Sequence, residues 1–220
     1  MSLIESIVAQ AGYRRGGAPV YGKPDMDKAA ILIMNLQLAW TAPDAPFRGL
    51  LPGQTRDFFT EIGDFATSCR QRGARIVWFR TTMGPSGSQH YWSTYLDNFV
   101  GPDKRGAAAD ALSPGNAMHG LDPTLPVHEQ DWIVDKPRFD AFLITDIETR
   151  LRAEGRRDLI VAGTATNICC ESTVRSAMQR DFRTWMPYDL VSAPTEDGHV
   201  AGLRSVTQSF AETRASREIL

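Results

Sequence analysis

The stretch AILIMNLQLAW, residues 30–40, decides the predicted fold because it turns from apolar to polar within a few positions. Residues 29–35 are predicted as a strand, since a continuously apolar run is typical of a parallel strand covered on both faces. Asn35 and Gln37 then stand where this buried strand ends, and Trp40 follows closely. Ligands bind at the carboxyl ends of strands in α/β sheets, so this end is the first place to look for a site.

Strands and helices alternate along the rest of the chain. Thr55 or Asp57 is expected to cap a helix with apolar positions 58, 62, 65, 66 and 69, and Gly73 ends it. This alternation predicts an α/β fold with a mainly parallel sheet and right-handed crossovers. The further elements are expected as strands at 74–81, 131–136, 156–163 and 182–190 and as helices at 144–155, 167–180 and 196–210.

Composition narrows the class of protein. The 220 residues are enough for one large domain (1–220), and the formal charge of -2 gives no basic footprint for nucleic acid. No apolar run approaches the ~20 residues of a membrane span, and the N-terminal residues lack the order of a secretory signal. Three cysteines, two of them adjacent, make a poor disulfide framework, so we expect a cytoplasmic protein.

Two segments stand apart from the alternating pattern. Residues 82–130 are rich in Gly and Pro and weakly patterned, so they are predicted to form a lid or oligomer-contact region with short helices. Residues 1–20 form an N-terminal extension whose apolar part, LIESIVAQA, is expected to pack on a neighbouring copy. The expected partners are a small-molecule substrate and further copies of the chain, as a homodimer or homotetramer.

The adjacent cysteines differ in their predicted roles. Cys170 shares a stripe at helical spacing with Val174, Ala177 and Met178, which should face the sheet as core. Cys169 lies off that stripe, in a first helical turn that Thr166 or Asn167 would cap. N–H groups and the helix dipole favour a thiolate there, so Cys169 is either a nucleophile or a buried structural thiol.

Three motifs carry a family resemblance. ILIMNLQLAW, VDKPRFDAF and VAGTATNICCESTVRSAM, in this order and separation, resemble the isochorismatase-like cysteine hydrolases, most of all the N-carbamoyl and ureidoacrylate amidohydrolase branch. The resemblance runs from about Ala29 to Phe210. It implies a doubly wound, six-stranded sheet with helices on both faces, and amide hydrolysis without a cofactor.

The resemblance also implies a catalytic set. The family nucleophile falls on Cys169, its lysine on Lys136, and its nonproline cis peptide between Thr164 and Ala165. The N–H groups of Ala165 and Cys169 are then expected to form an oxyanion hole. The family aspartate falls on Asn35, which is a departure from the pattern.

The implied reaction is attack of the Cys169 thiolate on an amide, carbamoyl or imide carbon, giving a thioester that water hydrolyses. An amide side chain cannot transfer the proton as the aspartate would. Three explanations for Asn35 stay open: an engineered trap, a natural change in which Asp25, Asp27 or a water replaces the acid, or a catalytically silent protein that binds a small ligand.

Two related activities fit less well. Members that cleave the vinyl ether of isochorismate need the aspartate rather than the cysteine. Nicotinamidases carry an Asp/His metal site, whereas residues 80–92 contain His90 alone. His119, His128 and His199 also lack partners at ligand spacing, so these histidines are interpreted as surface or loop residues and no metal is expected.

Substrate contacts are expected from aromatic residues near the strand ends. Trp40 and Phe139 match aromatic positions of the family, and Trp92 or Tyr91 would close over the site. Asn167 is a further expected substrate contact. An aromatic pocket suits a small planar neutral amide, ureide or imide, although Arg80 and Arg138 near strand ends leave an acidic substrate open.

Overall fold

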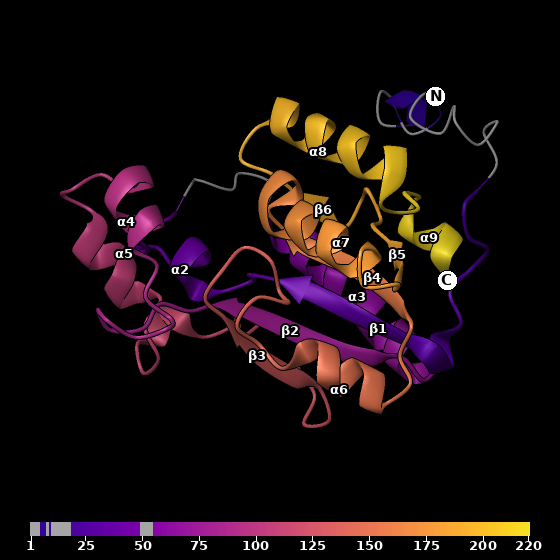
Figure 1. Cartoon of the computed structure of the whole chain (residues 1–220), viewed down its shortest axis with the longest axis horizontal. Coiled ribbons are helices and arrows are strands. Elements are labelled where there is room, and N and C mark those ends of the chain that lie inside the picture. Colours follow the sequence, from indigo (N-terminus) through magenta and orange to yellow (C-terminus); the bar gives the residue numbers. More distant parts are fainter. Residues whose placement is uncertain (1–4, 8, 10–18, 49–54) are drawn as a thin grey trace.

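A parallel sheet forms the centre of the molecule (Figure 1). The computed structural model describes residues 5–7, 9, 19–48 and 55–220. The paired strands run parallel in the order β3-β2-β1-β4-β5, and β6 pairs with β4. They are β1 (Ala29–Met34), β2 (Arg75–Thr81), β3 (Trp132–Lys136), β4 (Asp158–Thr164), β5 (Arg183–Trp185) and β6 (Val191–Ser192). The predicted α/β fold with a doubly wound six-stranded sheet is confirmed.

The order of strands reverses between β1 and β4. The chain moves from β1 to β2 and β3 on one side, and returns to β4 and β5 on the other. Met34, the last residue of β1, is paired with Phe79 on one side and with Gly163 on the other. A reversal of this kind opens a crevice beyond the carboxyl ends of the strands, which is where a ligand site is expected.

Helices cover both faces of the sheet. Ala30, Leu32 and Met34 of β1 pack in one core with α6, α7 and α8, whereas 29, 31 and 33 pack in a second core with α3 and α9. Successive strand residues point to opposite faces, which is why an unbroken apolar run serves both cores. The helices are α3 (Arg56–Gln71), α6 (Ile147–Ala153), α7 (Glu171–Met178), α8 (Glu196–Ser209) and α9 (Ser216–Ile219).

Helix α3 begins and ends as its sequence predicts. The Thr55 hydroxyl accepts a hydrogen bond from the Phe58 N–H, so Thr55 is the cap and Asp57 lies in the first turn. Gly73 follows the helix with φ of 94°, a conformation that glycine adopts without a side-chain clash. A Cβ at this position would also lie 2.3 Å from Asp27 Oδ1.

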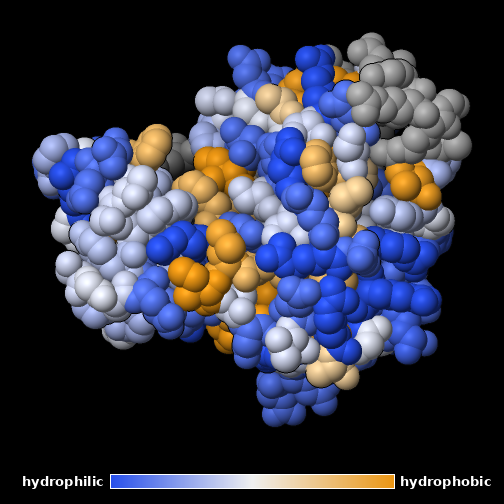
Figure 2. All heavy atoms as spheres, viewed as in Figure 1, coloured by the Kyte–Doolittle hydropathy of each residue, from blue (hydrophilic) through white to orange (hydrophobic). Residues whose placement is uncertain are grey.

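The segment 82–130 forms short helices that project from the sheet (Figure 1). Together with α2 (Leu38–Thr41) and the loop that follows it, this segment builds a small core of its own around Ala39, Phe47, Met83 and Leu96. Hydrophobic residues also gather on the surface between this part and the body of the molecule (Figure 2). Its helices are α4 (Ser93–Phe99), α5 (Arg105–Ala111) and the 3-10 turn η3 (Ala117–His119).

The chain after β4 differs from the single predicted helix. It first forms a π-helical turn, η4 (Thr166–Cys170), and continues as α7. Cys170, Val174 and Ala177 are buried as predicted, but Met178 is 38% exposed at the end of α7, where the stripe has turned away from the sheet. Of the predicted strand 182–190, only 183–185 pair with β4, and β6 was not predicted.

None of the helices in the described ranges has the length and apolarity needed to cross a membrane. Most of the N-terminal helix predicted over residues 3–11 lies outside the described residues. Ile7, which is described, is 2% exposed within the chain itself.

Candidate active site

The sulfur of Cys169 lies at the point where four strand ends meet. Asn35 follows β1, Thr81 ends β2, Lys136 ends β3 and Thr164 ends β4. Asn35 Nδ2 lies 3.0 Å from Cys169 Sγ, and Lys136 Nζ lies 3.4 Å from the same atom. Cys169 is 4% exposed. Two N–H donors directed at one sulfur stabilise negative charge on it.

The orientation of the Asn35 amide follows from its other contacts. Nδ2 also donates to the carbonyl oxygen of Thr164 (2.8 Å), which can only accept. Oδ1 accepts from the Thr81 hydroxyl at 2.8 Å. Asn35 has φ of 57°, a left-handed conformation that asparagine tolerates better than most residues. The amide nitrogen, rather than its oxygen, therefore faces the sulfur.

Lys136 is fully buried, and three acceptors surround its ammonium group. Nζ donates to Thr81 Oγ1 (3.2 Å), to the Arg138 carbonyl (3.1 Å) and to Cys169 Sγ (3.4 Å). A lysine has three N–H donors, so these contacts account for all of them. Because the hydroxyl of Thr81 receives the lysine N–H, its own hydrogen is directed to Asn35.

Gln37 fixes the end of β2 rather than facing a substrate. Its Oε1 accepts from the Thr81 N–H (2.7 Å), and its Nε2 donates to the carbonyls of Thr81 (3.1 Å) and His119 (2.9 Å). Gln37 is fully buried. It therefore ties Thr81, and through it the Asn35 amide, to segment 82–130.

The sulfur opens into a cavity of about 350 Å³. Its wall is mostly aromatic and aliphatic. The lining residues come mainly from the strand ends, α2, segment 82–130 and η4. The lining residues are Asn35, Trp40, Phe47, Thr81, Met83, Trp92, Thr94, Tyr95, Phe99, Leu112, Phe139, Ala165, Ile168, Cys169 and Pro194. A cavity of this size and character fits a small organic molecule.

The aromatic residues of the wall pack against one another. The ring centroids of Trp92 and Phe139 lie 4.7 Å apart in a T-shaped contact, and those of Trp40 and Phe47 lie 5.2 Å apart and stacked. Tyr95 lies 5.5 Å from Phe139. The structure thus brings the predicted residues Trp40, Phe139 and Trp92 to one cavity, with Phe47 and Tyr95 added.

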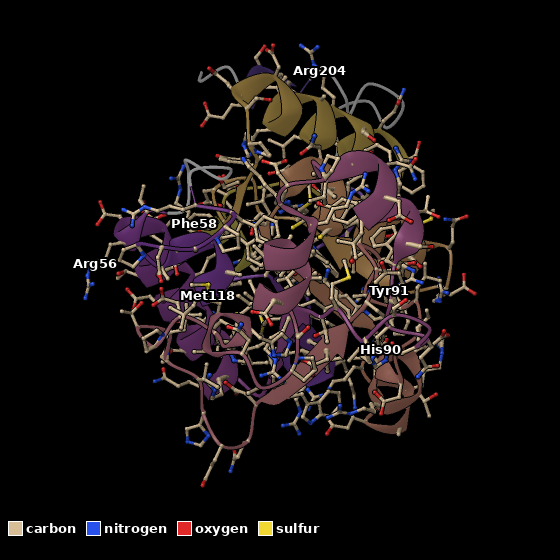
Figure 3. All side chains as sticks on the ribbon, turned by 90° about the vertical axis from the view of Figure 1, so that its left-hand side faces the viewer. Arg56, Phe58, His90, Tyr91, Met118 and Arg204 are labelled. Carbon is tan, nitrogen blue, oxygen red and sulfur yellow. The ribbon has the colours of Figure 1, made fainter. Side chains whose placement is uncertain are left out.

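Two predicted contacts lie elsewhere. Asn167 does not line the cavity: it is exposed, and it lies on the side of η4 that packs against Gly198 and Gly202 of α8. The π-helical turn, which the sequence pattern does not reveal, sets this direction. Tyr91 is also outside the cavity lining. Figure 3, which faces segment 82–130, shows Tyr91 and His90 on the opposite side of the view from Met118.

Neither arginine near the strand ends lines the cavity. Arg80 pairs with Asp135 (2.7 Å) on the outer side of β2 and β3. The guanidinium of Arg138 lies over the Trp92 ring, 5.0 Å from its centroid, and donates to the carbonyls of Pro137 and Tyr91. Trp92 therefore separates this charge from the space beside the sulfur.

The two carboxylates proposed to replace an acid at Asn35 are in the wrong place. Asp25 precedes the 3-10 turn η2 (Met26–Lys28) and Asp27 lies within it, and this turn precedes β1. They lie at the amino end of the strand, whereas Asn35 follows its carboxyl end. The Asp25 carboxylate instead lies 3.7 Å from Arg157. Neither residue reaches the sulfur.

Two histidines differ from their predicted environment. His199 is half-buried on helix α8, and its Nδ1 lies 2.9 Å from Thr166 Oγ1. His119 is 3% exposed, and its Nε2 lies 2.7 Å from Thr82 Oγ1. Burial, and then the charge of Arg80, lower the pKa of His119, so it is a buried neutral side chain rather than a surface residue. Within the described ranges, no three His, Cys, Asp or Glu side chains gather in a way that could hold a metal ion.

The other cysteines have different surroundings. Burial raises the pKa of Cys69 to about 12, and burial raises the pKa of Cys170 well above its usual value. Both are core residues of the two sheet faces. Only Cys169 of these three lines the cavity.

Comparisons with known proteins agree with this arrangement. The family model described as the isochorismatase domain matches residues 29–218. A ureidoacrylate amidohydrolase of Methylorubrum extorquens is 28% identical over 192 residues, covering 79% of this chain and 77% of the relative.

Solved structures share the fold. A cysteine hydrolase from Pseudomonas syringae pv. phaseolicola has a TM-score of 0.79 at 21% identity, over 92% of this chain and 95% of that chain. A nicotinamidase/pyrazinamidase from Bacillus subtilis has a TM-score of 0.69 at 19% identity, over 85% and 99%.

Proposed function

The chain belongs to the isochorismatase family, and from this premise we propose that it is a cysteine-dependent amidohydrolase. Its substrate is a small amide, carbamoyl (ureide) or imide, and the C–N bond breaks through a thioester on Cys169. The observation that carries this proposal is the sulfur itself, which faces an aromatic cavity while an ammonium and an amide N–H are directed at it.

The Cys169 thiolate is the nucleophile. Lys136 supplies a full positive charge 3.4 Å from the sulfur, and Asn35 Nδ2 adds an N–H donor at 3.0 Å. The thiolate attacks the carbonyl carbon, and the N–H groups of Ala165 and Cys169 are the proposed donors to the resulting oxyanion. Both residues line the cavity, which supports this assignment.

Proton transfer falls to Lys136 in this mechanism. Asn35 presents N–H to the sulfur and cannot accept a proton there. The N–H of Lys136 that points at Cys169 Sγ (3.4 Å) loses this acceptor when the sulfur bonds to carbon. The ammonium is therefore assigned the transfer of this proton to the leaving nitrogen, which departs as ammonia or an amine and leaves the thioester. Water then adds to the thioester and returns its proton to the neutral amine of Lys136, and the acid is released as the thiolate re-forms.

The relatives named as ureidoacrylate amidohydrolases support a carbamoyl group among the candidate substrates. The competing function is that of a catalytically silent member that binds a small ligand. Asn35 at the family aspartate position supports this alternative, because general acid–base residues contribute roughly 10²–10⁴ in rate.

A panel of small amides and ureides, assayed for ammonia release, separates the two functions. A hydrolase releases ammonia from at least one compound and loses this activity in Cys169→Ser. Binding without release by the unaltered chain and by Asn35→Asp would leave only the silent binder.

We further propose that the chain is cytoplasmic and functions as a homodimer or homotetramer, with segment 82–130 acting as a lid or as an oligomer contact. The small separate core of this segment supports its treatment as one unit. Size-exclusion chromatography that gives a monomer would remove the oligomer from the proposal.

A further inference from the structure

Among the described residues, no Asp, Glu, Lys or Arg side chain lines the cavity beside Cys169. Apart from Asn35, Thr81, Thr94, the Tyr95 phenol and Cys169 itself, its wall consists of apolar and aromatic side chains. A charge that enters such a space loses its hydration and gains no partner, which strongly disfavours binding. The lining therefore selects against charged substituents.

The cations close to the cavity are already engaged. The three N–H groups of Lys136 are directed at Thr81, the Arg138 carbonyl and Cys169. Arg138 lies over Trp92 and Arg80 pairs with Asp135, so neither guanidinium faces the space that a substrate would occupy. A substrate carboxylate would find no arginine or lysine clamp among these residues.

The nucleophile adds to this selection. Tyr95 and Cys169 line the same cavity. Burial, and next the charge of Cys169, raise the pKa of Tyr95. Tyr95 is thus a neutral phenol at physiological pH, suited to hydrogen bonding with an uncharged polar group. A carboxylate placed between Tyr95 and Cys169 would meet a second negative charge.

We propose that the substrate is a neutral amide or ureide whose substituent is an uncharged aromatic or branched aliphatic group, and that amides bearing a carboxylate are rejected. This inference rests on the proposed function, because it places the amide at Cys169. The substituent then lies between the Trp92–Phe139 pair and the Trp40–Phe47 pair. A volume of about 350 Å³ has room for one substituted ring.

Two ligands of the same shape test the proposal. para-Nitrobenzamide and para-carboxybenzamide carry isosteric groups, and only the second is an anion near neutral pH. Isothermal titration calorimetry with the Cys169→Ser chain measures binding without turnover. We expect the nitro compound to bind at least roughly 100-fold more tightly, since an unpaired buried charge is heavily penalised.

Phe99 offers a matched pair of variants. It lines the cavity but is 77% exposed, so substitution there leaves the packed core intact. Phe99→Arg introduces a cation at the wall and is expected to shift the ratio of affinities at least roughly tenfold toward the carboxylate. Phe99→Gln removes the ring without adding charge, and the ratio should stay within about threefold of that of the parent chain.

Equal binding of the two benzamides, tighter binding of the anion, or no measurable binding of either would overturn the inference. This outcome is distinct from a failure of the proposed function, which is measured separately as ammonia release by the unaltered chain. Selective binding of the nitro compound, together with no ammonia release from any compound of the panel, would refute the amidohydrolase and leave the selectivity of the cavity standing.

Discussion

Replacement of Asn35 by aspartate is expected to speed ammonia release and to slow alkylation of Cys169. The two directions differ because each measurement depends on a different property of the side chain. A carboxyl group can carry a proton between the thiol and the leaving nitrogen, which an amide cannot. The amide N–H stabilises the thiolate at 3.0 Å, which a carboxylate cannot.

The expected change in the rate of ammonia release follows from these two effects. General acid–base catalysis contributes roughly 10²–10⁴ in rate. The lost N–H bond to a charged sulfur costs about 1.5 kcal/mol or more, or roughly tenfold. A carboxyl oxygen at the Nδ2 position would also face the Thr164 carbonyl at 2.8 Å, which favours the protonated, proton-donating form. The net gain in ammonia release is therefore about tenfold to 10³-fold.

The assay couples ammonia release from a neutral amide to a dehydrogenase, and iodoacetamide labelling of Cys169 is followed in parallel by peptide mass spectrometry. Asn35→Ala is the matched control: it loses the N–H donor without gaining an acid, so it should slow alkylation and leave ammonia release no faster. An Asn35→Asp chain that releases ammonia no faster than the parent chain would show that Asn35 does not occupy the site of proton transfer.

Three further outcomes are expected. Iodoacetamide at neutral pH should modify Cys169 far faster than Cys69, whose pKa burial raises to about 12; equal rates in peptide mass spectrometry would contradict the assigned nucleophile. Thr81→Val removes the hydroxyl that orients Asn35 and should lower kcat roughly tenfold, the effect of one lost buried hydrogen bond, and an unchanged kcat would refute that orienting role. Burial lowers the pKa of His119 in the folded chain, so below pH 6.5 the unfolded chain binds more protons than the folded chain. The free energy of unfolding must therefore fall as the pH drops from 6.5 toward the folded pKa of His119. Urea unfolding should therefore show a shallower loss of stability in His119→Asn over this range, and an equally steep loss in both chains would contradict it.

Local patterns predicted the sheet and the start of α3. An unbroken apolar run is typical of a parallel strand that is covered on both faces. The residues of β1 do pack alternately in the two cores. A cap at Thr55 or Asp57 was predicted before the amphipathic run, and the structure shows the cap bond between Thr55 and Phe58. These features depend on neighbours in the sequence, so the sequence alone was enough.

The misplaced residues depend on geometry that has no local signature. The π-helical turn shifts the register after β4, which sends Asn167 toward α8. The end of α7 leaves Met178 exposed although it continues the apolar stripe. His119 is buried where it contacts Thr82, a residue 37 positions earlier in the chain that directly follows β2.

The roles of Thr81 and Gln37 were within partial reach of the sequence. Both are polar residues at strand ends, and this position indicates that they lie at the edge of the sheet. It does not indicate which residues they bond to. The contact of Thr81 with both Asn35 and Lys136 joins three strands, and this can only be seen once the strand order is known.

Acyl trapping shows whether a thioester forms on Cys169 during turnover. A reaction with a hydrolysed neutral amide is quenched in acid, digested, and analysed by peptide mass spectrometry. We expect the acyl mass on the peptide that carries Cys169, and no turnover by Cys169→Ser. Turnover retained in Cys169→Ser, or an acyl group on another residue, would contradict the assignment of Cys169 as the nucleophile.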